Sequence, residues 1–313
     1  MIDILMATYN GEAFLEEQLD SIIHQSYSEW HLIVRDDCSS DRTVSILQKY
    51  KAMYPEKISV IINENRTGSA KANFFKLLHD AQSEYIMFSD QDDVWKIDKL
   101  KFTLKKMKQL ERKSEKEIPL LVATDLEVVN AEGRQINKSF LHYMNLQGDI
   151  RLNHLLIQNN ITGCTVMMNC TLCEMLKEVK SVEKIVMHDH FAGLVAVTFG
   201  KAVMLDRATI QYRQHTRNSV GAMDAKSFAY MYQRFKRGRK QFRLDMMDSM
   251  KQAEYLITLY EKTFDAGMTW KRQMLLRYSQ LVGRSRVEKY RFYFKYHVFK
   301  HGLVRKLMQL IWS

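Results

Sequence analysis

The sequence lacks any apolar run long enough for a membrane-spanning helix. None of its uninterrupted apolar stretches approaches the roughly 18 to 20 residues that a bilayer requires. The chain opens on a strand-like segment, residues 2–5, and not on the charged and apolar regions of a signal peptide. We therefore expect a cytoplasmic protein, either free or attached peripherally to the inner face of the cell membrane.

Cysteine is scarce, and its spacing is uninformative. Only four cysteines are present, and two of them, Cys170 and Cys173, form a single Cys-x-x-Cys pair. A zinc site needs a second pair at comparable spacing, and a redox pair usually follows a strand in a thioredoxin-like unit. We expect reduced, mostly buried thiols.

Two common nucleotide-binding motifs are also missing. No Gly-x-Gly-x-x-Gly follows the first predicted strand, and Gly-x-x-x-x-Gly-Lys-[Ser/Thr] occurs nowhere. These absences exclude an ordinary dinucleotide-binding domain and a P-loop ATPase.

Composition indicates a folded globular protein with an uneven charge. The 313 residues are 46% hydrophobic and 27% charged, which suits one large domain or two smaller ones. Residues 225–313 hold 20 Lys and Arg against 6 Asp and Glu, a net charge of +14, so the total of +11 leaves −3 for residues 1–224. This asymmetry predicts separate roles for the two parts.

Strand-like and helix-like segments alternate through the first hundred residues. Strands are predicted at 2–7, 30–35, 58–62 and 85–88, and a predicted helix follows each of the first three. Such alternation predicts an α/β fold with a doubly wound, mostly parallel sheet, whose ligands bind beyond the carboxyl ends of the strands. Further strands are expected at 121–129 and 166–168, with a loop over 134–150 that covers the acceptor.

Polar and acidic residues follow three of these strands. They are residues 8–10, then Asp36 and Asp37, then Asp90, Asp92 and Asp93. Carboxylates packed this tightly repel one another unless a cation lies among them, and oxygen ligands suit Mg²⁺ or Mn²⁺. A helix-capping acidic turn would need no metal, but independent caps have no reason to gather at one edge of a sheet. A diphosphate held by metal and carboxylates fits a nucleotide-sugar.

Three motifs together resemble glycosyltransferase family 2, which has the GT-A fold. They are ATYNG at 7–11, RDDCSSDRT at 35–43 and SDQDDVW at 89–95. The last is most similar to bacterial rhamnosyltransferases. One departure is Cys38, where the family usually has glycine.

The resemblance implies a nucleotide-sugar site near the first four strands. Asp36 or Asp37 would bind the imide of a uracil or thymine base, with Thr8 and Tyr9 beside the base and ribose. Asp90 would lie near the ribose and the metal, and Asp92 would ligate the metal. The same site would include Ala7, Gln91, Arg66 and Lys71, of which the two cations have a solvated surface position as the alternative.

The resemblance also places the chemical step later in the chain. Asp189 matches the base of an inverting transferase, with a helix N-cap as the alternative. Arg213 would neutralise the leaving group, and His215 would bind the metal or a phosphate. The expected acceptor side comprises Trp95, Gly163, Cys164 and His188, although Gly163 can equally be a turn glycine and His188 an ordinary packed histidine.

The basic tail is predicted to be helical. Residues 290–300 interleave aromatic with basic side chains, which is typical of a helix lying on an anionic membrane. The alternative is a bundle that packs on the catalytic part or on a second subunit of a homo-oligomer. The tail contains none of the modules that recognise nucleic acid.

Together these features predict an inverting, metal-dependent glycosyltransferase. Residues 1–224 would form the GT-A domain, with a nucleotide-sugar half at about 1–100 and an acceptor half at about 120–224, and residues 225–313 would associate with a membrane or mediate oligomerisation. The expected donor is dTDP-β-L-rhamnose and the expected acceptor a glycan or lipid-linked glycan of a bacterial surface polysaccharide. Alternatives are another UDP- or dTDP-hexose for capsule or O-antigen synthesis, or a non-catalytic subunit with a vestigial nucleotide site.

Overall fold

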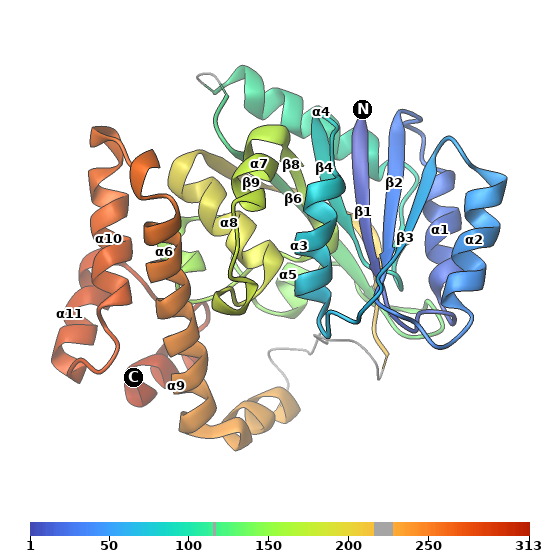
Figure 1. Ribbon diagram of the computed structural model, residues 1–313. Coiled ribbons are helices and arrows are strands. Elements are labelled where there is room, and N and C mark those ends of the chain that lie inside the picture. The colour runs from blue at the N-terminus through green and yellow to red at the C-terminus, as the bar shows by residue number, and fades with distance from the viewer. Residues whose placement is uncertain (115–116, 216–227) are drawn as a thin grey trace.

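The computed structural model describes residues 1–114, 117–215 and 228–313. Within these residues a nine-stranded sheet has helices packed on both faces, and the C-terminal helices lie at the end of the molecule opposite α1 and α2 (Figure 1). The predicted fold class is therefore confirmed.

The first four strands are parallel, as predicted. They are β1 (Ile2–Thr8), β2 (Trp30–Asp36), β3 (Ile58–Ile62) and β4 (Tyr85–Ser89), in the order β3-β2-β1-β4. Thr8 pairs with Asp36, and Met6 pairs with Ser89. The residues that follow β1, β2 and β4 therefore leave the sheet at the same edge.

The second half of the sheet is mixed. It comprises β8 (Met167–Asn169), β6 (Leu120–Val129), β9 (Lys201–Arg213), β5 (Val94–Trp95) and β7 (Gln135–Asn137). β8 is antiparallel to both β4 and β6, β6 is parallel to β9, and β5 is antiparallel to β9. Because β5 directly follows the carboxylates of 90–93, its pairing brings them beside the end of β9.

Helices cover the two faces of the sheet with separate apolar cores. The first face carries α1 (Leu15–Ile23), α2 (Thr43–Met53) and α4 (Lys99–Arg112). The second carries α3 (Ala70–Asp80), α7 (Cys170–Lys177) and α8 (His188–Phe199). Alternate residues of β1 serve the two cores, with Ile4 and Met6 in the first and Leu5 in the second.

The segment 134–150 is more ordered than the sequence suggests. It contains β7 and the single-turn helix α5 (Phe140–Tyr143), so the expectation of a plain loop is wrong over these residues. Asp125 of β6 explains part of this order, because its Oδ1 accepts the backbone N–H groups of Phe140 and Leu141 at 3.1 and 3.2 Å.

Cys38 occupies a position that favours glycine. Its φ is +63°, in the left-handed region, and its thiol donates to the carbonyl of Asn63 at 3.1 Å. The glycine usual here in the family is therefore explained by backbone conformation, and the thiol–carbonyl contact accompanies the replacement.

The C-terminal helices pack back on the helices that cover the sheet. They are α9 (Phe228–Leu259), α10 (Thr269–Ser279), α11 (Arg286–Tyr296) and α12 (Leu303–Trp312), with α9 kinked at Gly238. Met250, Leu256 and Tyr278 belong to the same apolar core as α8. In the described parts of the chain, no helix has the length and hydropathy to cross a membrane.

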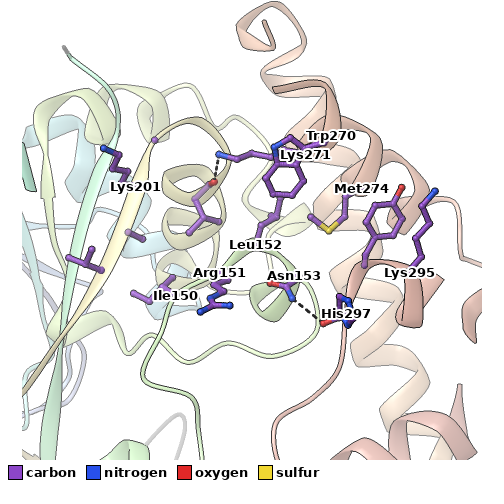
Figure 2. Close-up of a pocket in the computed structure, with 15 residues that line it drawn as sticks. Ile150, Arg151, Leu152, Asn153, Lys201, Trp270, Lys271, Met274, Lys295 and His297 are labelled. Atoms are coloured by element: carbon purple, nitrogen blue, oxygen red, sulfur yellow. Dashed lines mark hydrogen bonds between the residues drawn. The ribbon is translucent and has the colours of Figure 1, made fainter. Parts of the chain in front are cut away.

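A hollow of about 570 Å³ marks the seam between these helices and the sheet (Figure 2). Lys271 spans it and donates to the carbonyls of Val197 and Thr198 near the end of α8, both at 2.8 Å. On the other side Asn153, in the short helix α6 (Leu152–Leu155), donates to the carbonyl of His297 at 3.0 Å. These polar contacts attach α10 to α8 and the end of α11 to α6.

Candidate active site

A pocket of about 630 Å³ opens where β1 and β4 end and where α3 and α8 begin. Eleven of the residues predicted for the site line it: Ala7, Thr8, Tyr9, Asp37, Arg66, Asp90, Gln91, Asp92, Gly163, His188 and Asp189. The carboxylates that follow β2 and β4 and the one near the start of α8 therefore share one hollow with the residues at the end of β1. Such a volume is in the range of small-molecule sites.

Asp37 lies at one end of the pocket, where several hydrogen-bond donors surround its carboxylate. Its carboxylate accepts the backbone N–H of Thr67 at 2.6 Å, the backbone N–H of Gly68 at 3.1 Å and the side-chain amide of Asn63 at 2.9 Å. Burial alone would raise the pKa of Asp37, but these hydrogen bonds lower it below its ordinary value. Asp37 is thus a fixed anion next to the loop that carries Arg66.

Tyr9, Gln91 and Arg66 form the adjacent wall. The amide of Gln91 accepts from the backbone of Tyr9 at 2.9 Å and donates back to its carbonyl at 3.0 Å. The guanidinium of Arg66 lies 3.8 Å from the centre of the Tyr9 ring. Gly11 is needed here, because a Cβ would approach Oε1 of Gln91 to 2.4 Å. The ATYNG and SDQDD motifs are therefore joined through Gln91.

The carboxylates after β4 repel one another. Burial, then the charges of Asp92 and Asp189, raise the pKa of Asp90 to about 7. Burial and the charges of Asp92 and Asp90 raise the pKa of Asp93 well above its usual range. Oδ2 of Asp93 is buried and has no hydrogen-bond partner among the described residues. A hard divalent cation would relieve this repulsion, so the residues fit a metal.

Asp90 and Asp92 are better placed than Asp93 as candidate metal ligands. Both line the pocket, and Oδ2 of Asp92 lies 2.9 Å from Nε2 of His215. Asp93 points inward, where ligand atoms of Asp90, Asp93 and Cys164 lie within 4.8 Å of one another. Burial, then the nearby carboxylates, raise the pKa of the Cys164 thiol, which is hydrogen-bonded to Asp93. A protonated thiol is a poor ligand for Mg²⁺ or Mn²⁺.

Asp189 begins α8 and is held on several sides. It accepts the backbone N–H of His190 at 2.6 Å, the side-chain amide of Asn159 at 3.3 Å and the backbone N–H of Gly163. Burial raises the pKa of Asp189 to about 7, even though these hydrogen bonds oppose the shift. A carboxylate with this pKa can accept a proton near neutral pH.

Gly163 allows the close approach of α8. A Cβ at this position would lie 2.7 Å from Nε2 of His188. The His188 ring stacks on Phe74 at 4.2 Å between centroids, and burial lowers its pKa to about 3. Neither ring nitrogen has a hydrogen-bond partner within the described chain. The His188 imidazole is therefore neutral, and it lines the pocket with two buried nitrogens that have hydrogen-bonding capacity.

Six predicted site residues do not line the pocket: Asp36, Lys71, Trp95, Cys164, Arg213 and His215. Asp36 is buried and accepts the hydroxyl of Thr8 at 2.9 Å and the backbone N–H of Ser39 at 2.8 Å, so it organises the loop. Asp36 and Asp37 were the two candidates for binding the uracil or thymine base, and of these only Asp37 lines the pocket. Lys71 donates to the carbonyl of Ile185.

Trp95 and Cys164 are core residues, with relative exposures of 3% and 0%. Their side chains therefore do not contribute to the wall of the pocket.

Arg213 and His215 do not line the pocket but contact Asp92 and Asp93. The backbone of Arg213 donates to Asp93 at 3.2 Å, and its guanidinium donates to the carbonyl of Asp92 at 3.0 Å and pairs with Glu17. His215 stacks on Phe14 at 4.8 Å while it contacts Asp92. Residues 216–227, which follow His215, lie outside the described chain.

The pocket also includes residues that sequence reasoning missed. Asn73 and Phe74 of α3, Asn159, Met144 and Leu146, and two tail residues, Lys300 and Arg305, contribute to its wall. Only Asn159 carried a signal, since it opens the polar turn before Gly163.

Lys99 is a buried cation in the neighbourhood of Asp93 and Cys164. Its relative exposure is 0%, and its ammonium lies 4.6 Å from the centre of the Trp95 ring. Burial lowers the pKa of Lys99 to about 8, against the attraction of Cys164 and Asp93. Lys99 lies in a lysine-rich helix, so the sequence pattern did not indicate that its side chain is buried.

Comparison with known proteins agrees with this geometry. The family model "Glycosyl transferase family 2" matches residues 3–115. The chain is 33% identical to the dTDP-rhamnosyl transferase RfbG of Shigella flexneri, over 69% of this chain and 74% of that protein.

Solved structures share the fold at low identity. S. aureus TarS 1-349 in complex with UDP superposes with a TM-score of 0.56 at 17% identity, over 91% of this chain and 73% of that chain. The mannosyltransferase PcManGT from Pyrobaculum calidifontis, in complex with GDP-Man and Mn²⁺, gives 0.52 at 14% identity, over 99% and 85%. With the carboxylate pocket and the match to RfbG, the conclusion is that this chain belongs to glycosyl transferase family 2 and is a glycosyltransferase with a GT-A-like fold.

Proposed function

We propose that this enzyme is an inverting, metal-dependent rhamnosyltransferase. It would transfer L-rhamnose from dTDP-β-L-rhamnose to a hydroxyl of a glycan or lipid-linked glycan during synthesis of a bacterial surface polysaccharide. The observation that carries the proposal is the shared pocket of Asp37, Asp92 and Asp189. The 33% identity with the rhamnosyl transferase RfbG supports the choice of donor.

The donor would lie along the pocket from Asp37 to Asp92. Asp37 keeps its charge because donors from 63–68 hold it, so it would accept the imide N–H of thymine. Tyr9 and Arg66 would enclose the nucleoside. Asp90 and Asp92, with His215 next to Asp92, would hold Mg²⁺ or Mn²⁺, which would supply positive charge to the leaving diphosphate.

Asp189 would act as the base. Its carboxylate would take the proton of the acceptor hydroxyl while that oxygen forms a bond to the anomeric carbon. The bond from this carbon to the diphosphate oxygen would break on the opposite face, and dTDP would leave with the bonding electron pair. His188 would orient sugar hydroxyls, since its ring is neutral and lines the pocket.

The tail would take part in this site. Residues 1–224 would form the catalytic domain, but Lys300 and Arg305 also line the pocket, so the basic part 225–313 would complete the acceptor side as well as contact an anionic membrane. Homo-oligomerisation through these helices remains a prediction. The complete carboxylate set and the family membership argue against a non-catalytic subunit.

Donor preference can be measured by thermal shift with Mn²⁺ and a panel of nucleotide-sugars. We expect dTDP-β-L-rhamnose to raise the melting temperature most, because a ligand that binds only the folded state stabilises it by mass action. UDP-glucose and UDP-N-acetylglucosamine serve as matched comparisons. A larger shift with a UDP-hexose would identify that nucleotide-sugar as the donor in place of dTDP-β-L-rhamnose. The assignment of the site residues would not change.

The pH dependence of transfer follows from Asp189. Because the base must be deprotonated and its pKa is about 7, we expect kcat/KM to fall about tenfold per pH unit below 7 and to level off above it. Initial rates between pH 5.5 and 8.5 at saturating Mn²⁺ would show this fall in kcat/KM below pH 7. A flat profile for the wild-type enzyme would contradict the assignment of the base.

A further inference from the structure

Helix α12 has its apolar side on the outside. Leu303, Leu307 and Ile311 are 75%, 49% and 60% exposed, and Val304 is 44% exposed. At about 100° per residue these positions fall within one arc of roughly 100°. The opposite face carries Arg305 and Gln309, which are 6% and 0% exposed. A helix that faces water would have the reverse arrangement.

Polar contacts fix the helix in this orientation. The guanidinium of Arg305 donates to the carbonyls of Met144 and Asn145 at 2.6 and 2.7 Å. The amide of Gln309 donates to the carbonyl of Val298 at 2.9 Å and accepts the backbone N–H of Lys300 at 2.8 Å. Rotation of α12 to bury its leucines would break all four hydrogen bonds, and buried polar groups without partners are costly.

Cations surround the C-terminal end of the same helix. Arg286 donates to the carbonyl of Ile311 and Arg243 to that of Trp312, both at 3.1 Å. The charges of Arg243 and Arg286 lower the pKa of Arg239, and together with burial these three arginines also lower the pKa of Lys289. In the part of the chain that the structure describes, no acidic side chain forms an ion pair with this cationic cluster of Arg239, Arg243, Arg286 and Lys289.

We propose that the exposed face of α12 and the cationic cluster form a docking surface for a bilayer that contains anionic lipids. Leu303, Leu307 and Ile311 enter the boundary between headgroups and acyl chains, and the cluster binds headgroup phosphates. A second copy of the chain fits this surface less well. A two-fold interface would place the cationic cluster next to its own symmetry mate.

Docking in this way brings the active site to the membrane. Arg305 lines the catalytic pocket from the inner side of α12, so the pocket lies about one helix diameter, roughly 10 Å, from the lipid surface. This orientation rests on the proposed function, and it lets an acceptor sugar on a lipid carrier reach Asp189. The docking itself requires no turnover.

Vesicle flotation tests the surface with the full-length protein. We expect binding to phosphatidylglycerol-rich vesicles at low salt and little binding to phosphatidylcholine vesicles. The triple variant Leu303→Gln, Leu307→Gln, Ile311→Gln should bind the anionic vesicles at least about tenfold more weakly, because it loses the inserted apolar groups. Arg239→Gln should weaken binding about fivefold.

A matched triple variant separates this effect from a general loss of apolar surface. Met53→Gln, Ile62→Gln and Ile97→Gln change side chains that are 50%, 46% and 62% exposed on other elements, and they should leave binding unchanged. An unchanged donor-induced thermal shift would show that each variant is folded. Equal vesicle binding by the α12 variant, or no binding by the wild type, would overturn the proposal. So would a wild-type dimer in light scattering that the α12 variant converts to a monomer without any vesicle binding.

Discussion

Replacement of Asp189 by asparagine should reduce transfer by roughly 10²-fold or more while donor binding stays close to that of the wild type. Asparagine keeps the shape and one acceptor oxygen for His190 and Asn159, but it cannot take a proton from the acceptor. Rates with the preferred donor, together with calorimetric binding of dTDP and Mn²⁺, would measure both effects.

The same substitution should make the ligand-free protein more stable at neutral pH. Burial raises the pKa of Asp189 from its ordinary value of 3.8 to about 7 in the folded protein, so the charge on Asp189 costs progressively more as pH rises from 4 to 7. The asparagine side chain would carry no such cost, and we expect a melting temperature a few degrees higher at pH 7 and equal at pH 4. Transfer at the wild-type rate by the variant would remove Asp189 from the role of base.

Replacement of Asp92 by alanine should abolish metal-dependent binding of the nucleotide. Its Oδ2 lies beside His215 and its side chain lines the pocket, so the substitution removes a proposed ligand and leaves the imidazole without its carboxylate. Titration of dTDP with and without Mn²⁺ should show a large gain in affinity for the wild type and none for the variant.

Asp206→Ala is the matched control for this experiment. Asp206 is an exposed carboxylate on β9 and does not line the pocket, so its removal should leave the effect of Mn²⁺ unchanged. Full retention of the metal effect by Asp92→Ala would contradict the assignment of Asp92 as a ligand.

The sequence allowed the catalytic edge to be predicted because parallel strands place their carboxyl ends together. Tyr9, Asp37 and Asp90 each follow a strand of the β2-β1-β4 set, so their meeting in one pocket needed only the strand order. The choice between Asp36 and Asp37 needed coordinates. Neighbouring residues at a strand end point to different sides, and the sequence does not say which side is open.

The sequence motifs did not predict which polar side chains are buried or which residues distant in sequence come into contact. Lys99 belongs to a run of lysines that all look solvated, yet its side chain is fully buried and feels the charge of Asp93. Arg305 reaches the pocket from more than a hundred residues after Asp189 because the tail packs back along α8. The second half of the sheet also escaped prediction in part, since β5 and β7 are too short to show a period.

A crystal soaked with Mn²⁺ and dTDP, with data collected at the manganese absorption edge, would show directly whether these carboxylates hold a cation and a nucleotide together. We predict one anomalous peak between the carboxylates of Asp90 and Asp92 and the diphosphate, with the thymine at Asp37 and with Asp189 facing the same cavity. A peak elsewhere on the molecule, or a nucleotide bound outside this pocket, would contradict it.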